Sequence, residues 1–142
     1  MQKIVINSCY GGFGLSPVAT KEYLKLKGKE CFFYVDDFSN GYTKNLKVKV
    51  NISKITSLFF HTYIKDSGDS FIKCPSDKYY FWDKDIKRDD PDLIKVIKKL
   101  GSKKASGQCA ELTIVEIPDD VGWEIKEYDG FEHVAEKHRA WS

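Results

Sequence analysis

The chain has 142 residues, of which 42% are hydrophobic and 31% charged, so its composition is that of a globular protein and excludes wholesale disorder. Its 23 basic and 21 acidic residues give a net charge of +2, too small an excess for a protein that coats DNA or RNA. No apolar stretch approaches the roughly 20 residues of a membrane span, and nothing at the N-terminus resembles a signal peptide. We expect one cytoplasmic domain over residues 1–142, with no nucleic acid and no membrane as partner.

The cysteines and the aromatic residues limit the chemistry further. The four cysteines are widely spaced and form no C-x-x-C pair, so we expect reduced thiols, no metal and no cofactor. Aromatic residues make up 14% of the chain, more than one small core needs. Some of these rings are therefore expected at a ligand pocket or a subunit contact.

The chain opens with a strand, a glycine-rich loop and a helix. Lys3–Ser8 is rich in β-branched residues, which favours a strand. It leads into Cys9–Leu15, whose three glycines can adopt positive φ or let a ligand approach the backbone. Ser16 and Pro17 predict the N-cap and first residue of a helix, and Gly28 predicts its end.

The middle of the chain reads as strands. Cys31–Val35 predicts one, and the alternation of apolar and polar residues over Leu46–Ile52 predicts a half-exposed one. Leu58–Lys65 fits either a strand or a short buried helix, and its β-branched and aromatic content favours the strand.

The last third predicts a helix followed by three strands. Asp90 and Pro91 open the helix by the same cap-and-proline pattern, and Gly101 ends it. A mobile loop is expected at Ser102–Gly107. The strands are expected at Ala110–Ile117, Trp123–Glu127 and Phe131–Glu136, the last two joined as a hairpin by Asp129-Gly130. The resulting prediction is an α+β fold, a mainly antiparallel sheet with two helices, one near each end.

The glycine loop is the main candidate site. A loop between a strand and a helix N-terminus presents backbone N–H groups and the positive end of the helix dipole, which together suit a phosphate. Tyr10 and Phe13 add ring faces on which a purine could stack. The loop has neither the Walker A spacing nor G-x-G-x-x-G. A structural tight turn beneath packed aromatic rings therefore remains the alternative.

Three further groups are weaker candidates. Five aspartates between positions 83 and 92 could bind Mg²⁺, but the structural interpretation is preferred, with Asp90 as a helix cap and Arg88 as an ion-pair partner. His138 and Arg139 could clamp a phosphate, with His138 as an acid or base, or could simply close the C-terminus. Cys9 would be a nucleophile only if the helix N-terminus activated its thiol.

Three strings carry a resemblance to a known family. Ile6–Ser16 reads INSCYGGFGLS, Arg88–Ile94 reads RDDPDLI, and Glu127–Trp141 reads EYDGFEHVAEKHRAW. Together they resemble the phage Thoeris anti-defence sponge family. The ligand-binding residues that follow from the loop, the Arg88 segment and the closing string are Cys9, Tyr10, Gly11, Gly12, Phe13, Gly14, Leu15, Arg88, Asp90, His138 and Arg139.

The resemblance implies a protein that is not an enzyme and acts in the cytoplasm of an infected bacterium. It implies that the protein binds a cyclic ADP-ribose signal, glycocyclic ADP-ribose, without cleaving it and so blocks TIR-dependent immunity. It further implies homodimers with pockets between subunits, hexamers built from them, and cyclic oligonucleotides at a separate site. Residues 36–77 match no part of the family pattern.

Two other functions remain open on the residues alone. One is an enzyme acting on a nucleotide phosphate through Cys9, or through His138 with Arg139. The other is a protein-binding inhibitor of a host defence enzyme, using the aromatic run at 79–82.

Overall fold

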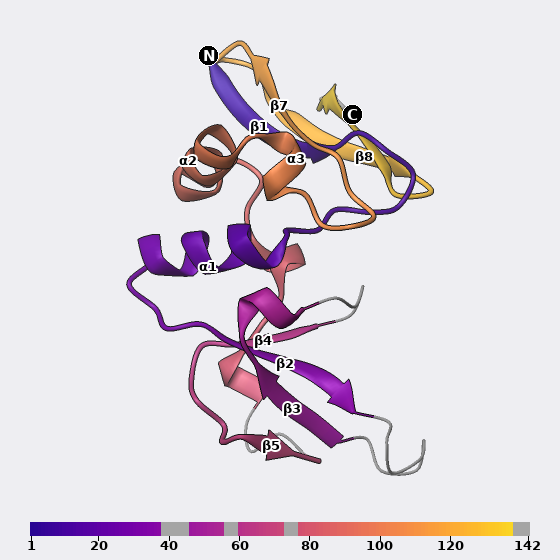
Figure 1. The fold of residues 1–142 in the computed structure, drawn as a ribbon. Helices are drawn as coiled ribbons and strands as arrows, with labels where there is room; N and C mark the ends of the chain where they lie inside the picture. The colour runs from indigo at the N-terminus through magenta and orange to yellow at the C-terminus, as the bar shows by residue number, and fades with distance from the viewer. Residues whose placement is uncertain (38–45, 56–59, 73–76, 138–142) are drawn as a thin grey trace. The chain divides into compact units, whose positions relative to one another are not determined.

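The computed structural model describes residues 1–37, 46–55, 60–72 and 77–137 (Figure 1). The chain divides into two compact units, Met1–Ala19 with Asp83–Ser142, and Thr20–Trp82. We call them the outer-segment unit and the middle unit. Every strand pair among the described residues is antiparallel, so the predicted α+β fold with mainly antiparallel sheet is confirmed. That residues 1–142 act as one ligand-binding domain stays a prediction.

The outer-segment unit is built on two strand pairs. β1 (Gln2–Asn7) pairs with β7 (Leu112–Ile117), and β8 (Trp123–Tyr128) forms a hairpin with β9 (Phe131–Glu136). Asp129 and Gly130 both have positive φ, at 50° and 84°, which matches the right-handed twist of a tight hairpin. The predicted hairpin and its Asp-Gly turn are confirmed.

Two helices of this unit lie together beside β1 and β7 (Figure 1). In α2 (Pro91–Leu100), the Asp90 side chain caps the helix by accepting the N–H of Asp92 at 2.9 Å, as expected from the sequence. The expected mobile loop after it was wrong. Residues Ser102–Ala105 form the short helix α3, because Ala105 is buried and the Ser102 hydroxyl donates to the Leu112 carbonyl at 2.6 Å. The short 3₁₀ turn η3 (Asp83–Asp85) opens the segment.

The middle unit contains a five-stranded sheet in the order β5-β3-β2-β4-β6. Its strands are β2 (Phe32–Asp37), β3 (Leu46–Val50), β4 (His61–Tyr63), β5 (Ser70–Phe71) and β6 (Tyr80–Phe81), and its 3₁₀ turns are η1 (Ile52–Lys54) and η2 (Asp77–Tyr79). The three strands predicted here are confirmed in the described residues, although β3 ends at Val50. The two shortest strands, β5 and β6, were not predicted.

The helix α1 (Pro17–Leu26) contains one boundary between the units, at Ala19 and Thr20. Its end has the geometry of a Schellman motif. Gly28 has φ of 71°, its N–H donates to the Lys25 carbonyl at 3.0 Å, and Lys29 donates to the Leu24 carbonyl at 2.9 Å. The predicted stop at Gly28 is confirmed.

The core of the middle unit accounts for part of the aromatic excess. Tyr34 is fully buried, and its ring lies 5.4 Å from Tyr63 and 4.9 Å from Phe71, measured between centroids. Its hydroxyl donates to the Gly68 carbonyl at 2.7 Å and accepts the Ser67 N–H at 3.1 Å, so its polar end is satisfied. No helix in the described part of the chain is long and apolar enough to cross a membrane.

Candidate ligand-binding loop

Asn7, the last residue of β1, fixes the start of the glycine loop. Its side chain is fully buried and has a partner at each end. The amide nitrogen donates to the carbonyls of Cys9 and Gly130, both at 2.8 Å, and the amide oxygen accepts the N–H of Glu111, also at 2.8 Å. One buried amide thus ties the loop to the β8–β9 turn and to the residue before β7.

The glycines at this junction serve two different purposes. A Cβ on Gly11 would lie 2.0 Å from the carbonyl oxygen of Cys109, and one on Gly130 would lie 2.5 Å from the nitrogen of Gly12. Both are glycines because backbones pack closely there. Gly12 differs, since it has φ of 109° and nothing within 4 Å of the position a Cβ would take. Only at Gly12 does the loop have open space beside a glycine with positive φ.

The second half of the loop is closed by the protein itself. Gly107 donates its N–H to the Gly14 carbonyl, and Ser16 donates to the Ala105 carbonyl, both at 2.9 Å. The N–H of Leu15 donates to Oδ2 of Asp83 at 2.9 Å. The Ser16 hydroxyl caps α1 by accepting the N–H of Ala19 at 3.1 Å. A carboxylate of the chain therefore already occupies the anion position nearest the helix.

The middle of the loop has backbone N–H groups that donate to no acceptor among the described residues. Within the described ranges, the N–H groups of Gly11, Phe13 and Gly14 donate no hydrogen bond. The Gly11 backbone is exposed, and Gly12 is half-buried. The prediction of an anion site narrows to the side of the loop around Gly12.

The two aromatic rings of the loop differ in exposure. Phe13 is buried, with 6% of its surface exposed, so it is not a free face for a purine. Tyr10 is 71% exposed, and its ring centroid lies 5.3 Å from that of Phe131 at the hairpin turn. Tyr128, at the other side of this turn, is 75% exposed. These three rings, which we call the turn aromatics, include the one ring of the predicted pair that a ligand can reach.

Arg88 is committed to a buried ion pair. Its Nη1 and Nη2 donate to Oε1 and Oε2 of Glu132 at 2.6 and 2.9 Å, and Nη1 also lies 3.3 Å from the Val5 carbonyl. The guanidinium lies over the Phe13 ring, 3.7 Å from its centroid. Glu132 also accepts the N–H of Asn7 at 2.8 Å. Arg88 therefore stabilises the loop by packing on Phe13 and pairing with Glu132. This is the structural ion-pair role that the sequence left open as the alternative to ligand binding.

The remaining predicted residues are placed as follows. Asp90 caps α2, and His138 and Arg139 lie outside the described residues. The Cys9 thiol donates to Oδ1 of Asn7 at 3.3 Å and to the Cys109 carbonyl at 3.4 Å, neither of which is a base that could take its proton. In the described ranges, no three His, Cys, Asp or Glu side chains gather where they could hold a metal ion.

No family model, curated protein or solved structure matches this chain.

Sequence analysis missed three residues that build the site. Asn7 was one polar residue at the end of an apolar strand, which was the only signal it gave. Glu132 lies in β9 between Phe131 and His133, which are both exposed, so the strand buries an acid and exposes a ring, the reverse of what side-chain polarity predicts. Asp83 is one of five aspartates between positions 83 and 92, and nothing in the sequence distinguishes the one that reaches the loop.

Asp83 leads to a testable pH dependence. Burial raises the pKa of its carboxyl above the ordinary 3.8, and the hydrogen bond from Leu15 and the charge of Lys84 offset only part of this. The folded protein thus holds this proton more tightly than the unfolded chain. Its contribution to the free energy of unfolding falls as pH rises from 3.8 through the raised pKa.

We expect that the stability of Asp83→Asn no longer falls over this pH range. The amide oxygen of asparagine still accepts the N–H of Leu15 but carries no charge. Chemical denaturation at a series of pH values measures the free energy of unfolding of each protein. Asp85→Asn, an exposed neighbour in the same turn, is the control and should follow the unmodified protein. Identical profiles for the Asp83 variant and the unmodified protein would show that burial of this charge has no effect.

Proposed function

We propose that the chain binds a cyclic ADP-ribose-type signalling nucleotide at the Gly12 side of the loop and holds it without cleaving it. The observation that carries the proposal is the open space beside Gly12, at φ of 109°, in a loop that also contains backbone donors without partners in the described part and the exposed ring of Tyr10. A pyrophosphate seeks N–H groups, and an adenine seeks a ring face.

The chemistry favours capture over turnover. The thiol of Cys9 donates to an amide oxygen and to a carbonyl, and neither group activates it as a nucleophile. A rigid cyclic ligand loses little conformational freedom when it binds, so tight capture needs no catalytic group. The resemblance to the Thoeris anti-defence sponge family supports the same proposal. According to this proposal, the protein acts in the cytoplasm of an infected bacterium and blocks TIR-dependent immunity.

The proposal assigns different roles to the residues first considered together. Tyr10 and Gly12 contact the ligand, whereas Phe13 and Arg88 hold the loop in shape. The homodimer, or hexamer, implied by the family would place a second copy over the turn aromatics and complete the pocket. A separate site for cyclic oligonucleotides is part of the same proposal.

The direct test is calorimetry with isomers of cyclic ADP-ribose, followed by chromatography of the released ligand. We expect Tyr10→Ala to weaken binding about 5–150-fold, the equivalent of losing about 1–3 kcal/mol of stacking. Trp82→Ala removes another exposed ring, 52% exposed and in the middle unit, and should leave the affinity unchanged. Failure of the unmodified protein to bind any isomer, or recovery of a cleaved ligand, would contradict the proposal.

A protein-binding role is the second candidate, favoured by the exposure of Tyr80 and Trp82, at 40% and 52%. The same two variants separate it from nucleotide capture. Co-purification of a host enzyme that is lost with Trp82→Ala and kept with Tyr10→Ala would assign the function to these rings.

A further inference from the structure

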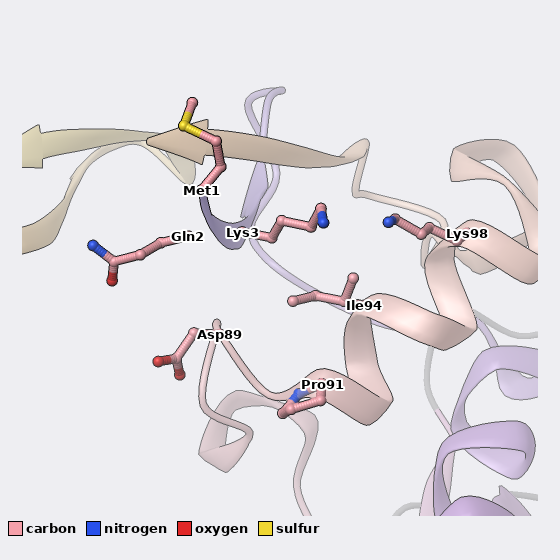
Figure 2. Close-up of a pocket in the computed structure, with 7 residues that line it drawn as sticks. All are labelled: Met1, Gln2, Lys3, Asp89, Pro91, Ile94 and Lys98. Carbon is pink, nitrogen blue, oxygen red and sulfur yellow. The ribbon is translucent and has the colours of Figure 1, made fainter. Parts of the chain in front are cut away.

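A second candidate site lies away from the glycine loop, in the outer-segment unit. A cavity of about 380 Å³ opens where the first residues of the chain meet one side of α2 (Figure 2). Its lining comprises Met1, Gln2, Lys3, Asp89, Pro91, Ile94 and Lys98. It lies at the start of β1, whereas the loop follows its end. A six-residue strand rising 3.3 Å per residue separates the two by about 20 Å.

Two cations face each other across this cavity. The ammonium groups of Lys3 and Lys98 point toward one another from β1 and from the last turn of α2 (Figure 2). Neither lysine forms an ion pair in the described part of the chain, and Glu116, opposite Lys3 on β7, makes none with it. Like charges that converge repel unless an anion lies between them. The pair therefore favours a ligand with two negative charges at one end.

The other walls define the rest of that ligand. Pro91 and Ile94 provide an apolar surface along α2, and Asp89 lies at the far end from the lysine pair (Figure 2). We infer that the cavity binds a small organic phosphate monoester. A monoester carries about −1.5 to −2 charge at pH 7, which matches two ammonium groups. Its body would lie on Ile94, with a hydroxyl or amine directed to Asp89. This site is independent of the nucleotide proposal.

The test measures the binding of phenyl phosphate in two ways, by calorimetry and by shifts of the backbone amide signals in NMR spectra. We expect saturable binding, with shifts at Gln2 and Ile94. Lys3→Met and Lys98→Met should each weaken it at least about tenfold, equivalent to about 1.4 kcal/mol. Lys95→Met, which removes an exposed lysine of α2 that does not line the cavity, is the matched control and should bind as the unmodified protein does.

Two further arms separate a built site from general attraction. The arginine variants Lys3→Arg and Lys98→Arg should keep most of the affinity, which shows that the methionine variants lose charge and not fold. Methyl phenyl phosphate, a diester with one charge, should bind at least about tenfold more weakly than the monoester. Equal weakening by Lys95→Met, equal affinity for the diester, or shifts confined to residues 10–14 would each overturn the inference.

Discussion

Glu132→Gln should destabilise the protein by about 3–5 kcal/mol, because it leaves the Arg88 guanidinium buried without a counter-charge. The side chains of Arg88 and Glu132 are 16% and 6% exposed, so water replaces the lost carboxylate only in part. Glutamine keeps one oxygen for the N–H groups of Asn7 and Arg88, but its NH2 group cannot accept from Nη2 of Arg88, so the variant loses the charge and one hydrogen bond of the pair. Denaturant unfolding measures the change. Glu136→Gln, at an exposed position of the same strand, should change stability by less than about 0.5 kcal/mol.

Removal of the cation should recover much of this loss. In the double variant Arg88→Met with Glu132→Gln no charge is buried, and the methionine still covers the ring of Phe13. We expect it to be more stable than Glu132→Gln alone. If the double variant were less stable than Glu132→Gln alone, the unpaired charge would not be the main cost, and Arg88 would be stabilising the fold through its other contacts, with the Val5 carbonyl and the Phe13 ring.

The loop and its surroundings were predictable where the signal is local. Ser16 before Pro17 and Asp90 before Pro91 predicted both helix starts, because a capping side chain and the fixed φ of proline act within one turn. The Asp129-Gly130 turn was predictable because few residue types adopt positive φ. Each of these signals depends on residues that lie next to one another in the chain.

The roles of the site residues depend on partners distant in sequence. Arg88 meets Glu132 across 44 positions, and Leu15 meets Asp83 across 68. No spacing rule connects such pairs, so Arg88 could not be assigned to the ligand or to the fold in advance. Burial of Phe13 follows from the same contacts. The division into two compact units has no local signal either, because its boundaries fall inside α1 and next to η3 and neither has the composition of a linker.

The loop has a part that the fold requires and a part, at Gly12, with open space beside it. Gly11 contacts the Cys109 backbone, Leu15 is held by Asp83, and Phe13 is covered by Arg88. The space beside Gly12 has no such structural use. Two explanations of Gly12 remain. If the loop is only a tight turn, the glycine is needed for its φ alone, whereas if the loop binds a ligand, the open space is needed as well. A nucleotide-binding measurement decides between them.

Gly11→Ala and Gly14→Ala form a matched pair that tests how the loop is held. Neither glycine has positive φ, so alanine is compatible with both backbones. At Gly11 the new Cβ would lie 2.0 Å from the Cys109 carbonyl oxygen, which is backbone and cannot rotate away. At Gly14 its nearest neighbour would be Oδ2 of Asp83 at 3.7 Å, an ordinary contact.

We expect Gly11→Ala to lower the free energy of unfolding by about 3 kcal/mol, as overpacking of a close backbone contact does. Gly14→Ala should be neutral or should stabilise by up to about 1 kcal/mol, because alanine reduces the freedom of the unfolded chain. Denaturant unfolding followed by tryptophan fluorescence compares the two. If Gly11→Ala were as stable as Gly14→Ala and the unmodified protein, the loop could move away from Cys109 at little cost. In that case Gly12 would have no fixed position beside Gly130, and the open space on which nucleotide capture depends would not persist in solution.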